Sequence, residues 1–287
     1  MQKLFLIDAH ALLHRFYHAL PPLTTPSGKP AQAIYGLSGV LLKMIQDFKP
    51  TFIAAAADTP VQTFRSEKFP TYKAHRPPTE DNLKSQLAEA PNTFAAFGIT
   101  LVRMPGYEAD DVIGTLAAEF GENELHIEIF SGDLDLLQLV RGETVTVTIL
   151  KTGISNVENY HEAKVLARYG VPPARIPDWK GLVGDPSDNI PGAKGIGPKT
   201  ARELLVEFGT LEEIYDNISI ITPTVAKKLE ASRTIVFESR ELATIHTDVP
   251  MEIPPLNSLA IHRFDPKALA TYFTEFGFES LRTRIAL

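Results

Sequence analysis

Short apolar runs in the first half of the chain each lead to an acidic residue. The runs "LFLI", "FIAAAA", "ITLVRMPGY" and "LHIEIF" are followed by Asp8, Asp58, Glu108 and Asp133. Segments with helical spacing lie at 31–48, 83–97 and 109–120. Strand-like runs that alternate with helical segments are typical of βαβ units on a parallel sheet. Ligands bind such sheets beyond the carboxyl ends of the strands, so the four carboxylates are expected to meet at one rim.

The pattern changes in the second half of the chain. "TVTVTIL" (144–150) and "GISNV" (153–157) are typical of two further strands that form an edge hairpin. After about residue 158 the spacing is helical, with short Pro/Gly turns between the segments. We therefore expect an α/β domain with a mostly parallel sheet over residues 1–170, followed by a smaller helical domain over residues 171–287.

Composition indicates a globular protein that can bury a sizeable core. Of the 287 residues 44% are apolar and 22% are charged, and none is cysteine, which excludes disulfides and thiolate metal sites. The N-terminal apolar run is too short for a signal peptide, and no later run approaches the length of a membrane span. We expect a cytoplasmic protein with no membrane partner.

The net charge of −7 argues at first against a nucleic-acid partner, because polyanion binders usually carry a basic balance. The location of the acids changes this picture. The candidates for one metal-binding cluster are Asp8, Asp58, Glu108, Asp110, Asp111, Asp133, Asp135, Asp185 and Asp188. With these nine carboxylates neutralised by metal, the remaining charge is +2, which is compatible with a polyanionic substrate.

The spacing of the acids favours a cluster. Glu108 and Asp111 are three residues apart in a helical segment and share one face. Each acid taken alone would be an ordinary helix cap, but converging carboxylates repel one another and would be forced to protonate. Divalent cations remove that repulsion. Oxygen ligands without thiols suit Mg²⁺ or Mn²⁺, and two such ions, roughly 3.5–4 Å apart, serve phosphodiester hydrolysis.

Three histidines fall at helical spacing near the N-terminus: His10, His14 and His18. This stripe could hold zinc, but no carboxylate is spaced among the imidazoles. Solvated or phosphate-facing histidines are the favoured interpretation.

The segment 60–82 is polar, basic and rich in proline. Its cations are interleaved with aromatic residues, a combination typical of a groove for single-stranded nucleic acid. Arg65 and Lys68 are candidate DNA contacts, and the segment is expected to be the most mobile element. The alternative is a solvated basic loop.

"GAKGIGPKTA" predicts a hairpin between two helices that binds phosphate. Glycine allows backbone N–H groups to approach a phosphate, and the following "TARELLVEFG" supplies a helix N-terminus. The expected DNA contacts are Lys194, Gly195, Gly197 and Lys199. A plain turn between helices is the alternative.

Five motifs together closely resemble the 5′-nuclease domain of bacterial DNA polymerase I, in the flap endonuclease family. They are "LIDAHALLHRFYHAL", "FRSEKFPTYKAHRPPTEDN", "YEADDVIGTLA", "SGDLDLLQL" and "GLVGDPSDNIPGAKGIGPKTA", spread over about residues 4–210. The resemblance implies cleavage of DNA at 5′ flaps and 5′ ends, as in primer removal and repair. The family often has glycine where Ala9 stands and a bulky residue where Ala57 stands.

The resemblance also implies roles for particular residues. The family's metal-binding acids map onto the nine carboxylates, and its arch, here about residues 60–95, places Tyr72, Lys73 and Arg76 at the reaction. A helix–three-turn–helix motif maps onto 192–205, within a DNA-binding stretch of about 181–210, and Arg15 and Thr200 join the expected DNA contacts. Mg²⁺ or Mn²⁺, two ions per site, would be the cofactor, with a monovalent cation as a further expectation at the hairpin. We also expect the protein to be a monomer near the nucleoid and to act with a polymerase domain or partner.

Three rival functions are consistent with parts of the pattern. A haloacid-type phosphatase needs a second acid two residues after the first, where this chain has His10. A PIN-type ribonuclease shares the acidic rim but lacks the hairpin and the basic arch. An inactive DNA-binding module would tolerate missing acids, and none of the expected acids is missing.

Overall fold

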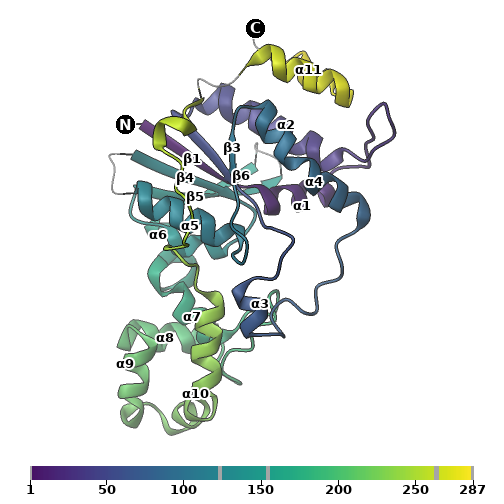
Figure 1. Ribbon diagram of the computed structural model, residues 1–287. Coiled ribbons are helices and arrows are strands. Elements are labelled where there is room, and N and C mark those ends of the chain that lie inside the picture. Colours follow the sequence, from purple (N-terminus) through teal and green to yellow (C-terminus); the bar gives the residue numbers. More distant parts are fainter. Residues whose placement is uncertain (1, 122–124, 153–155, 262–264, 286–287) are drawn as a thin grey trace.

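A mixed sheet forms the centre of the computed structural model, which describes residues 2–121, 125–152, 156–261 and 265–285. In those ranges the strands are β1 (Gln2–Asp8), β2 (Phe52–Ala56), β3 (Thr100–Val102), β4 (Leu125–Ser131), β5 (Val145–Thr152) and β6 (Asn156–Tyr160). Their order is β3-β2-β1-β4-β5-β6, parallel except for β6 (Figure 1). The predicted mostly parallel sheet and its antiparallel edge pair are confirmed; residues 153–155 of that hairpin lie outside the described ranges.

The strands alternate their side chains between two cores. In β1, Leu4 and Leu6 face one core, while Phe5 and Ile7 face the other. The first core lies under α5 (Ala109–Phe120) and continues into the helical part of the chain. Since both faces of a parallel sheet are covered, its strands are apolar almost throughout, which explains the apolar runs of the sequence.

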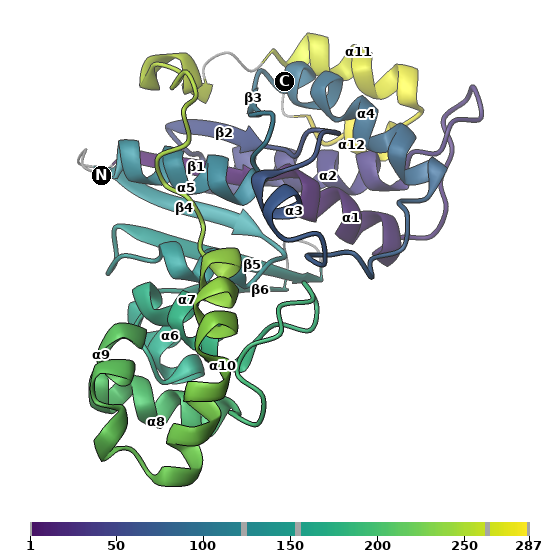
Figure 2. The same cartoon turned by 60° about the horizontal axis from the view of Figure 1, so that its bottom comes forward.

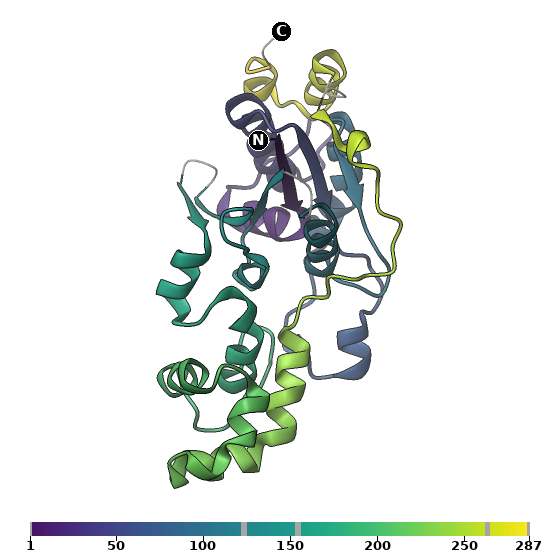
Figure 3. The ribbon, with the colours of Figure 1, turned by 90° about the vertical axis from the view of Figure 1, so that its left-hand side faces the viewer.

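Five helices cover the second face of the sheet. They are α1 (Ala9–Ala19), α2 (Gln32–Lys43), α4 (Asp81–Ala96), α11 (Pro266–Phe276) and α12 (Glu279–Arg282). The 31–48 segment is helical as predicted, although its last turn, Met44–Phe48, is a π-helix. α5 instead packs in the first core, on the other face. In Figure 3 the C-terminal helices, in yellow, lie beside the α/β part of the molecule. The C-terminal helices thus return to the α/β part of the molecule.

Five helices from the second half of the described chain form a separate group beside β5 and β6 (Figure 2). They are α6 (Glu162–Tyr169), α7 (Ile176–Val183), α8 (Pro198–Phe208), α9 (Leu211–Asp216) and α10 (Pro223–Ala243). Short 3₁₀ turns lie at Asp135–Leu139, Pro173–Arg175, Ile218–Ile220 and Leu256–Leu259. No helix among the described residues is long and apolar enough to cross a membrane.

The segment between β2 and α4 crosses from the sheet towards the helical group and back (Figure 1). It contains one short helix, α3 (Phe64–Lys68). A capping box formed by Thr63 and Ser66 stabilises the N-terminus of this helix. Arg65 ties this helix to the end of α10, because its Nε and Nη2 donate to the carbonyls of Leu242 and Thr244 at 3.0 and 2.6 Å. We call residues 60–80 the arch segment.

Candidate metal centre and DNA interface

The carboxyl ends of β1, β2 and β4, with the start of α5, line one cavity of about 220 Å³. Its acidic lining residues are Asp8, Asp58, Glu108, Asp110 and Asp133. The four acids that follow the apolar runs are therefore brought together, and Asp110 joins them from the first turn of α5. The parallel arrangement of the strands places all these side chains at the same edge.

Asp8 is both a helix cap and a member of the cavity. Its Oδ1 accepts from the backbone N–H of Ala11 at 2.9 Å, and its Oδ2 accepts from the hydroxyl of Ser131 at 2.6 Å. Burial is the main reason why its pKa is raised to about 6, and the charges of Asp58 and Asp133 act in the same direction. Asp8 is thus the N-cap of α1, as the alternative interpretation expected, and it also lines the carboxylate cavity.

Asp110 carries the least compensated carboxylate of the group. No described residue donates a hydrogen bond to it, and burial, followed by the charges of Asp8 and Asp133, raises its pKa well above the ordinary value. Asp58 instead accepts from the N–H of Ala109 at 2.7 Å and lies 3.6 Å from His10 Nε2. A carboxylate such as Asp110, held near others of like charge, favours the binding of a cation.

Asp111 and Arg65 lie beneath this surface and are paired with each other. Asp111 is fully buried, does not line the cavity, and accepts from both Nη atoms of Arg65 at 2.6 and 2.7 Å. Arg65 is 3% exposed. The structure thus places the residue predicted to bind metal and the residue predicted to contact DNA in a buried ion pair. This pair joins α3 to α5.

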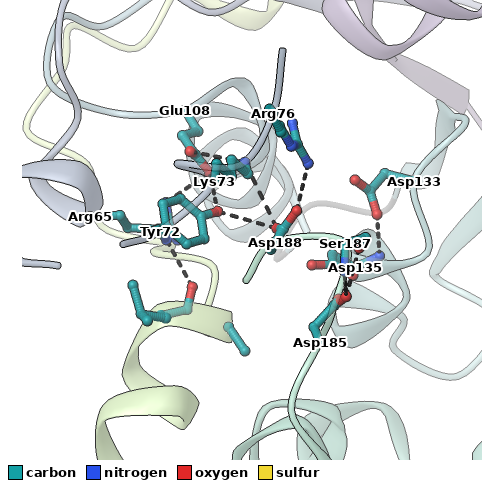
Figure 4. A network of polar contacts seen from close by, with 12 residues as sticks. Arg65, Tyr72, Lys73, Arg76, Glu108, Asp133, Asp135, Asp185, Ser187 and Asp188 are labelled. Carbon is teal, nitrogen blue, oxygen red and sulfur yellow. Dashed lines mark hydrogen bonds and ion pairs between the residues drawn. The ribbon is translucent and has the colours of Figure 1, made fainter. Parts of the chain in front are cut away.

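The arch segment directs three polar side chains at Glu108 and Asp188 (Figure 4). Lys73 Nζ lies 3.0 Å from Glu108 Oε1, and Tyr72 OH donates to Glu108 Oε2 at 3.1 Å. Arg76 Nη2 lies 2.5 Å from Asp188 Oδ1. Burial by itself lowers the pKa of Lys73, but the negative charges of Glu108 and Asp188 outweigh it and raise that pKa. The three arch residues therefore contact two of the acids that are candidate metal ligands.

Asp135 and Asp185 share a cation that we did not predict. Lys180, on α7, is 4% exposed and contacts both carboxylates, with 2.6 Å between its Nζ and Asp185 Oδ2. Burial, then the charge of Asp133, raises the pKa of Asp135 to about 7 despite this contact. The only feature of the sequence that could have indicated this contact is that Lys180 stands five residues before Asp185. The sequence pattern around Lys180 predicts only a helix.

A larger cavity, of about 1250 Å³, opens on the side of Asp135 and Asp185. Asp133 and Arg76 line both this cavity and the smaller one, so the two are continuous at these residues. The larger cavity carries five basic residues besides Arg76: Arg15, His18, Arg168, Lys180 and Arg202. Arg15 was expected as a DNA contact, whereas Arg168 and Arg202 were not predicted.

The remaining predicted DNA contacts lie away from the carboxylates. Lys68 is exposed and pairs with Glu241 of α10. Gly195, whose φ is +83°, and Gly197, which caps α8, form the turn between α7 and α8. The other predicted contacts of this turn and helix are Lys194, Lys199 and Thr200, and none of them is buried.

The histidine stripe is on α1, with two members in the carboxylate cavity. The rings of His10 and His14 have centroids 4.6 Å apart, and both residues line that cavity. Burial, followed by the charges of His10 and His18, lowers the pKa of His14 to about 4. Because the His14 ring is then neutral at physiological pH, it adds no positive charge to the site.

The carboxylate oxygens of the site are chemically suitable ligands for divalent cations. Among the described residues, no group of three or more acidic or histidine side chains is arranged to hold an ion as it stands. The carboxylates nevertheless line a common cavity, and the pKa values of Asp8, Asp110 and Asp135 are raised by burial and mutual repulsion. Hard oxygen donors that repel one another are the ligands that Mg²⁺ or Mn²⁺ would stabilise.

A mostly parallel sheet with an acidic cavity at its carboxyl edge, a basic arch beside that cavity and a group of helices next to the sheet define an α/β protein with a candidate cation site. Comparison with protein families specifies it further. The model of the 5′–3′ exonuclease N-terminal resolvase-like domain matches residues 3–170, and that of the 5′–3′ exonuclease C-terminal SAM fold matches residues 171–267. The chain belongs to the 5′–3′ exonuclease family.

Relatives of two lengths resemble this chain. DNA polymerase I of Caldicellulosiruptor bescii is 40% identical over 287 residues, 99% of this chain but 34% of the relative. The 5′–3′ exonuclease of Aquifex aeolicus is 34% identical over 281 residues, 98% of this chain and 94% of the relative. The chain thus spans about a third of the DNA polymerase I relatives and nearly the whole of the shorter one.

Solved structures confirm the fold. T5 5′-exonuclease with bound zinc ions is 22% identical, with a TM-score of 0.70 over 99% of this chain and 97% of that chain. The T5 D15 flap endonuclease, in a complex with DNA and metal ions, is 19% identical with a TM-score of 0.68 over the same shares. The expected 5′-nuclease fold, with its sheet and helical domain, is confirmed.

Proposed function

We propose that this chain is a structure-specific, metal-dependent nuclease that hydrolyses phosphodiester bonds in DNA at 5′ flaps and 5′ ends. The observation that carries the proposal is the acidic cavity at the sheet edge, with Lys73 and Arg76 of the arch directed into it. Rival phosphatase and ribonuclease functions lack this combination. T5 D15 flap endonuclease, a structural neighbour, binds DNA and metal ions, which agrees with the proposal.

Two groups of acids would hold the metal. Asp8, Asp58, Asp110 and Asp133 supply the first, and Asp135, Asp185 and Asp188 supply the second, with Glu108 beside both. Divalent ions bound there, Mg²⁺ or Mn²⁺, would activate water and neutralise charge on the phosphate. Asp111, which pairs with Arg65, is proposed to position α5 and not to bind metal.

The arch cations would bind the scissile phosphate. Lys73 and Arg76 now neutralise Glu108 and Asp188, and Tyr72 donates to Glu108. When metal neutralises these acids, both cations become free to pair with phosphate oxygens. Fixed donors aimed at developing negative charge stabilise the transition state, which is the role we propose for them.

The helical domain would hold the duplex. The turn with Gly195 and Gly197 offers backbone N–H groups and the N-terminus of α8 to a phosphate, and Lys194, Lys199 and Thr200 surround it. Arg15 and Lys68 are proposed as further contacts. We propose that the domain division falls at 170/171, that the chain acts as a monomer in the cytoplasm near DNA, and that a polymerase domain or partner works beside it.

The test is cleavage of a 5′-flap DNA in Mg²⁺, with single-stranded RNA as the competing substrate. Asp110→Asn should lose cleavage, since it removes the carboxylate with the strongest need for a cation. Glu119→Gln, an acid-to-amide change at an exposed position of the same helix, is the control and should cleave normally. Preference for the RNA, or full activity of Asp110→Asn, would refute the proposal.

A further inference from the structure

A third cavity, of about 520 Å³, adjoins the carboxylate cavity. His10 and Asp58 line both cavities, so the two meet at the edge of the metal centre. The third cavity extends from there between the ends of the arch segment, α4 and β3. It is part of neither the basic groove beside Asp135 nor the α7–α8 turn.

The walls of this cavity are apolar. They are formed by Leu13 of α1, Leu87 and Pro91 of α4, and Leu101 of β3. A cavity of several hundred Å³ with apolar walls and a few polar groups is typical of a small-molecule or side-group binding site. Its position next to the metal centre makes part of the DNA substrate the natural occupant.

One polar group in the wall lacks the partner that burial normally demands. The Oγ1 of Thr59 is buried and has no hydrogen-bond partner among the described residues. Pro91 lies inside α4 and has no N–H, so the carbonyl of Leu87 cannot receive the usual helical hydrogen bond from it. Buried polar groups are normally paired, so the Thr59 hydroxyl invites a ligand that can form a hydrogen bond with it.

The cavity also carries positive charge. Lys84 and Arg103 line it, and both are exposed to solvent. Lys84 forms an ion pair with Asp81 at 2.8 Å, on the surface, where such pairs are weak and can be exchanged for a phosphate. Apolar walls, a hydroxyl that can form a hydrogen bond and nearby cations together match a nucleotide.

We propose that this cavity receives a nucleobase of the unpaired DNA strand next to the scissile phosphate. The base would lie between the apolar residues of α1, α4 and β3, with its polar edge at Thr59. Lys84 or Arg103 would contact the adjoining phosphate. This inference rests on the proposed function, because it takes the carboxylate cavity as the place of cleavage.

The experiment combines a substitution that fills the cavity with substrates that lack one base. Ala88 is an exposed cavity residue of α4, so Ala88→Trp fills the space without disturbing the core. Ala95→Trp is the matched control, since Ala95 is exposed on the same helix and does not line the cavity. Binding of 5′-flap DNA is measured in Ca²⁺ to prevent turnover, with an abasic site placed at each unpaired nucleotide in turn.

One abasic position should weaken binding to the wild-type chain about tenfold, which is within the range that stacking of one base contributes. Ala88→Trp should weaken binding of the intact flap by the same factor and be insensitive to that abasic site. Ala95→Trp should behave as the wild type. A 2-aminopurine at the sensitive position should change its emission on binding to the wild type, and not to Ala88→Trp.

Equal binding of all abasic substrates by the wild-type chain would overturn the subsite. Thr59→Val provides a second test, because it keeps the shape but removes the hydroxyl, and it should weaken only substrates that carry the base. If these effects are missing while flap cleavage in Mg²⁺ persists, the subsite is wrong and the nuclease proposal stands. If no flap DNA is cleaved or bound, both are wrong.

Discussion

Asp110 and Asp111 are neighbours in α5, but they lie in opposite environments. Asp110 faces the carboxylate cavity, whereas Asp111 is buried and bonded to Arg65. The two residues therefore should respond differently to the same chemical change. An amide at 110 removes a repelled charge, and an amide at 111 leaves a buried guanidinium without its counter-ion.

Asp111→Asn should destabilise the fold by about 3–5 kcal/mol, the usual effect of breaking one half of a buried ion pair. Asp110→Asn should keep or raise stability in the absence of Mg²⁺ while losing cleavage. Urea unfolding and flap cleavage are measured on both variants. An inactive Asp111→Asn that is as stable as the wild type would restore Asp111 as a metal ligand.

Lys73 is the second residue whose role can be separated from simple tethering. Lys73→Ala should reduce single-turnover cleavage by about 10²–10³, because it removes a fixed donor to transition-state charge. Equilibrium binding of the flap should change much less. Lys43→Ala, on α2 and paired at the surface with Asp47, is the control. Equal losses of rate and affinity at Lys73 would make it an ordinary phosphate contact.

At the scale of elements, Gly195 and Gly197 in the turn between α7 and α8 differ in backbone conformation. Gly195 has φ of +83°, and an added Cβ would lie 3.2 Å from the Lys228 side chain. Gly197 has φ of −100°, and an added Cβ would meet no atom within 4 Å. Alanine at 195 is therefore strained by the backbone itself, while alanine at 197 is compatible with the fold.

Gly197→Ala should thus weaken duplex binding without loss of stability, if phosphate approaches this backbone closely. The slope of log affinity against log salt should fall by about 0.9 for each DNA phosphate that the variant no longer neutralises. Salt titrations in Ca²⁺ with long-duplex and minimal-duplex flaps measure this. Gly39→Ala, where an added Cβ has ordinary contacts, is the control. An unchanged slope would mean that Gly197 serves only the turn.

For the whole molecule, the crowded carboxylates link stability to pH and metal. Burial raises the pKa of Asp8 to about 6 and of Asp135 to about 7, from 3.8. Since the folded chain holds these protons more tightly than the unfolded chain, stability without metal should fall as pH rises from about 4 to 7 and then level off.

Mg²⁺ should therefore raise the unfolding temperature more at pH 8 than at pH 5, because it replaces protons at the same carboxylates. Thermal unfolding with and without Mg²⁺ at both pH values tests this. Asp110→Asn should show a smaller response to Mg²⁺. An equal effect of Mg²⁺ at both pH values would argue against a cation site among these acids.

Local sequence patterns were enough to predict the sheet, the main helices and the meeting of the strand-end acids. The period of apolar residues sets secondary structure, and parallel strands bring their carboxyl ends to one edge whatever the loops do. Asp8, Asp58 and Asp133 needed no further information. The family resemblance added Tyr72, Lys73 and Arg76, which the structure places against Glu108 and Asp188.

Tertiary packing decided which polar residues face the cavity and which are buried and paired inside the fold. Arg65 and Asp111 are 46 positions apart, and Lys180 and Asp135 are 45 apart, so their pairing has no local signature. The Thr59 hydroxyl, which is buried without a hydrogen-bond partner among the described residues, likewise has no local signature. A charged residue that faces the cavity and one that is paired inside the fold cannot be told apart in the sequence, because burial and pairing are properties of the folded chain.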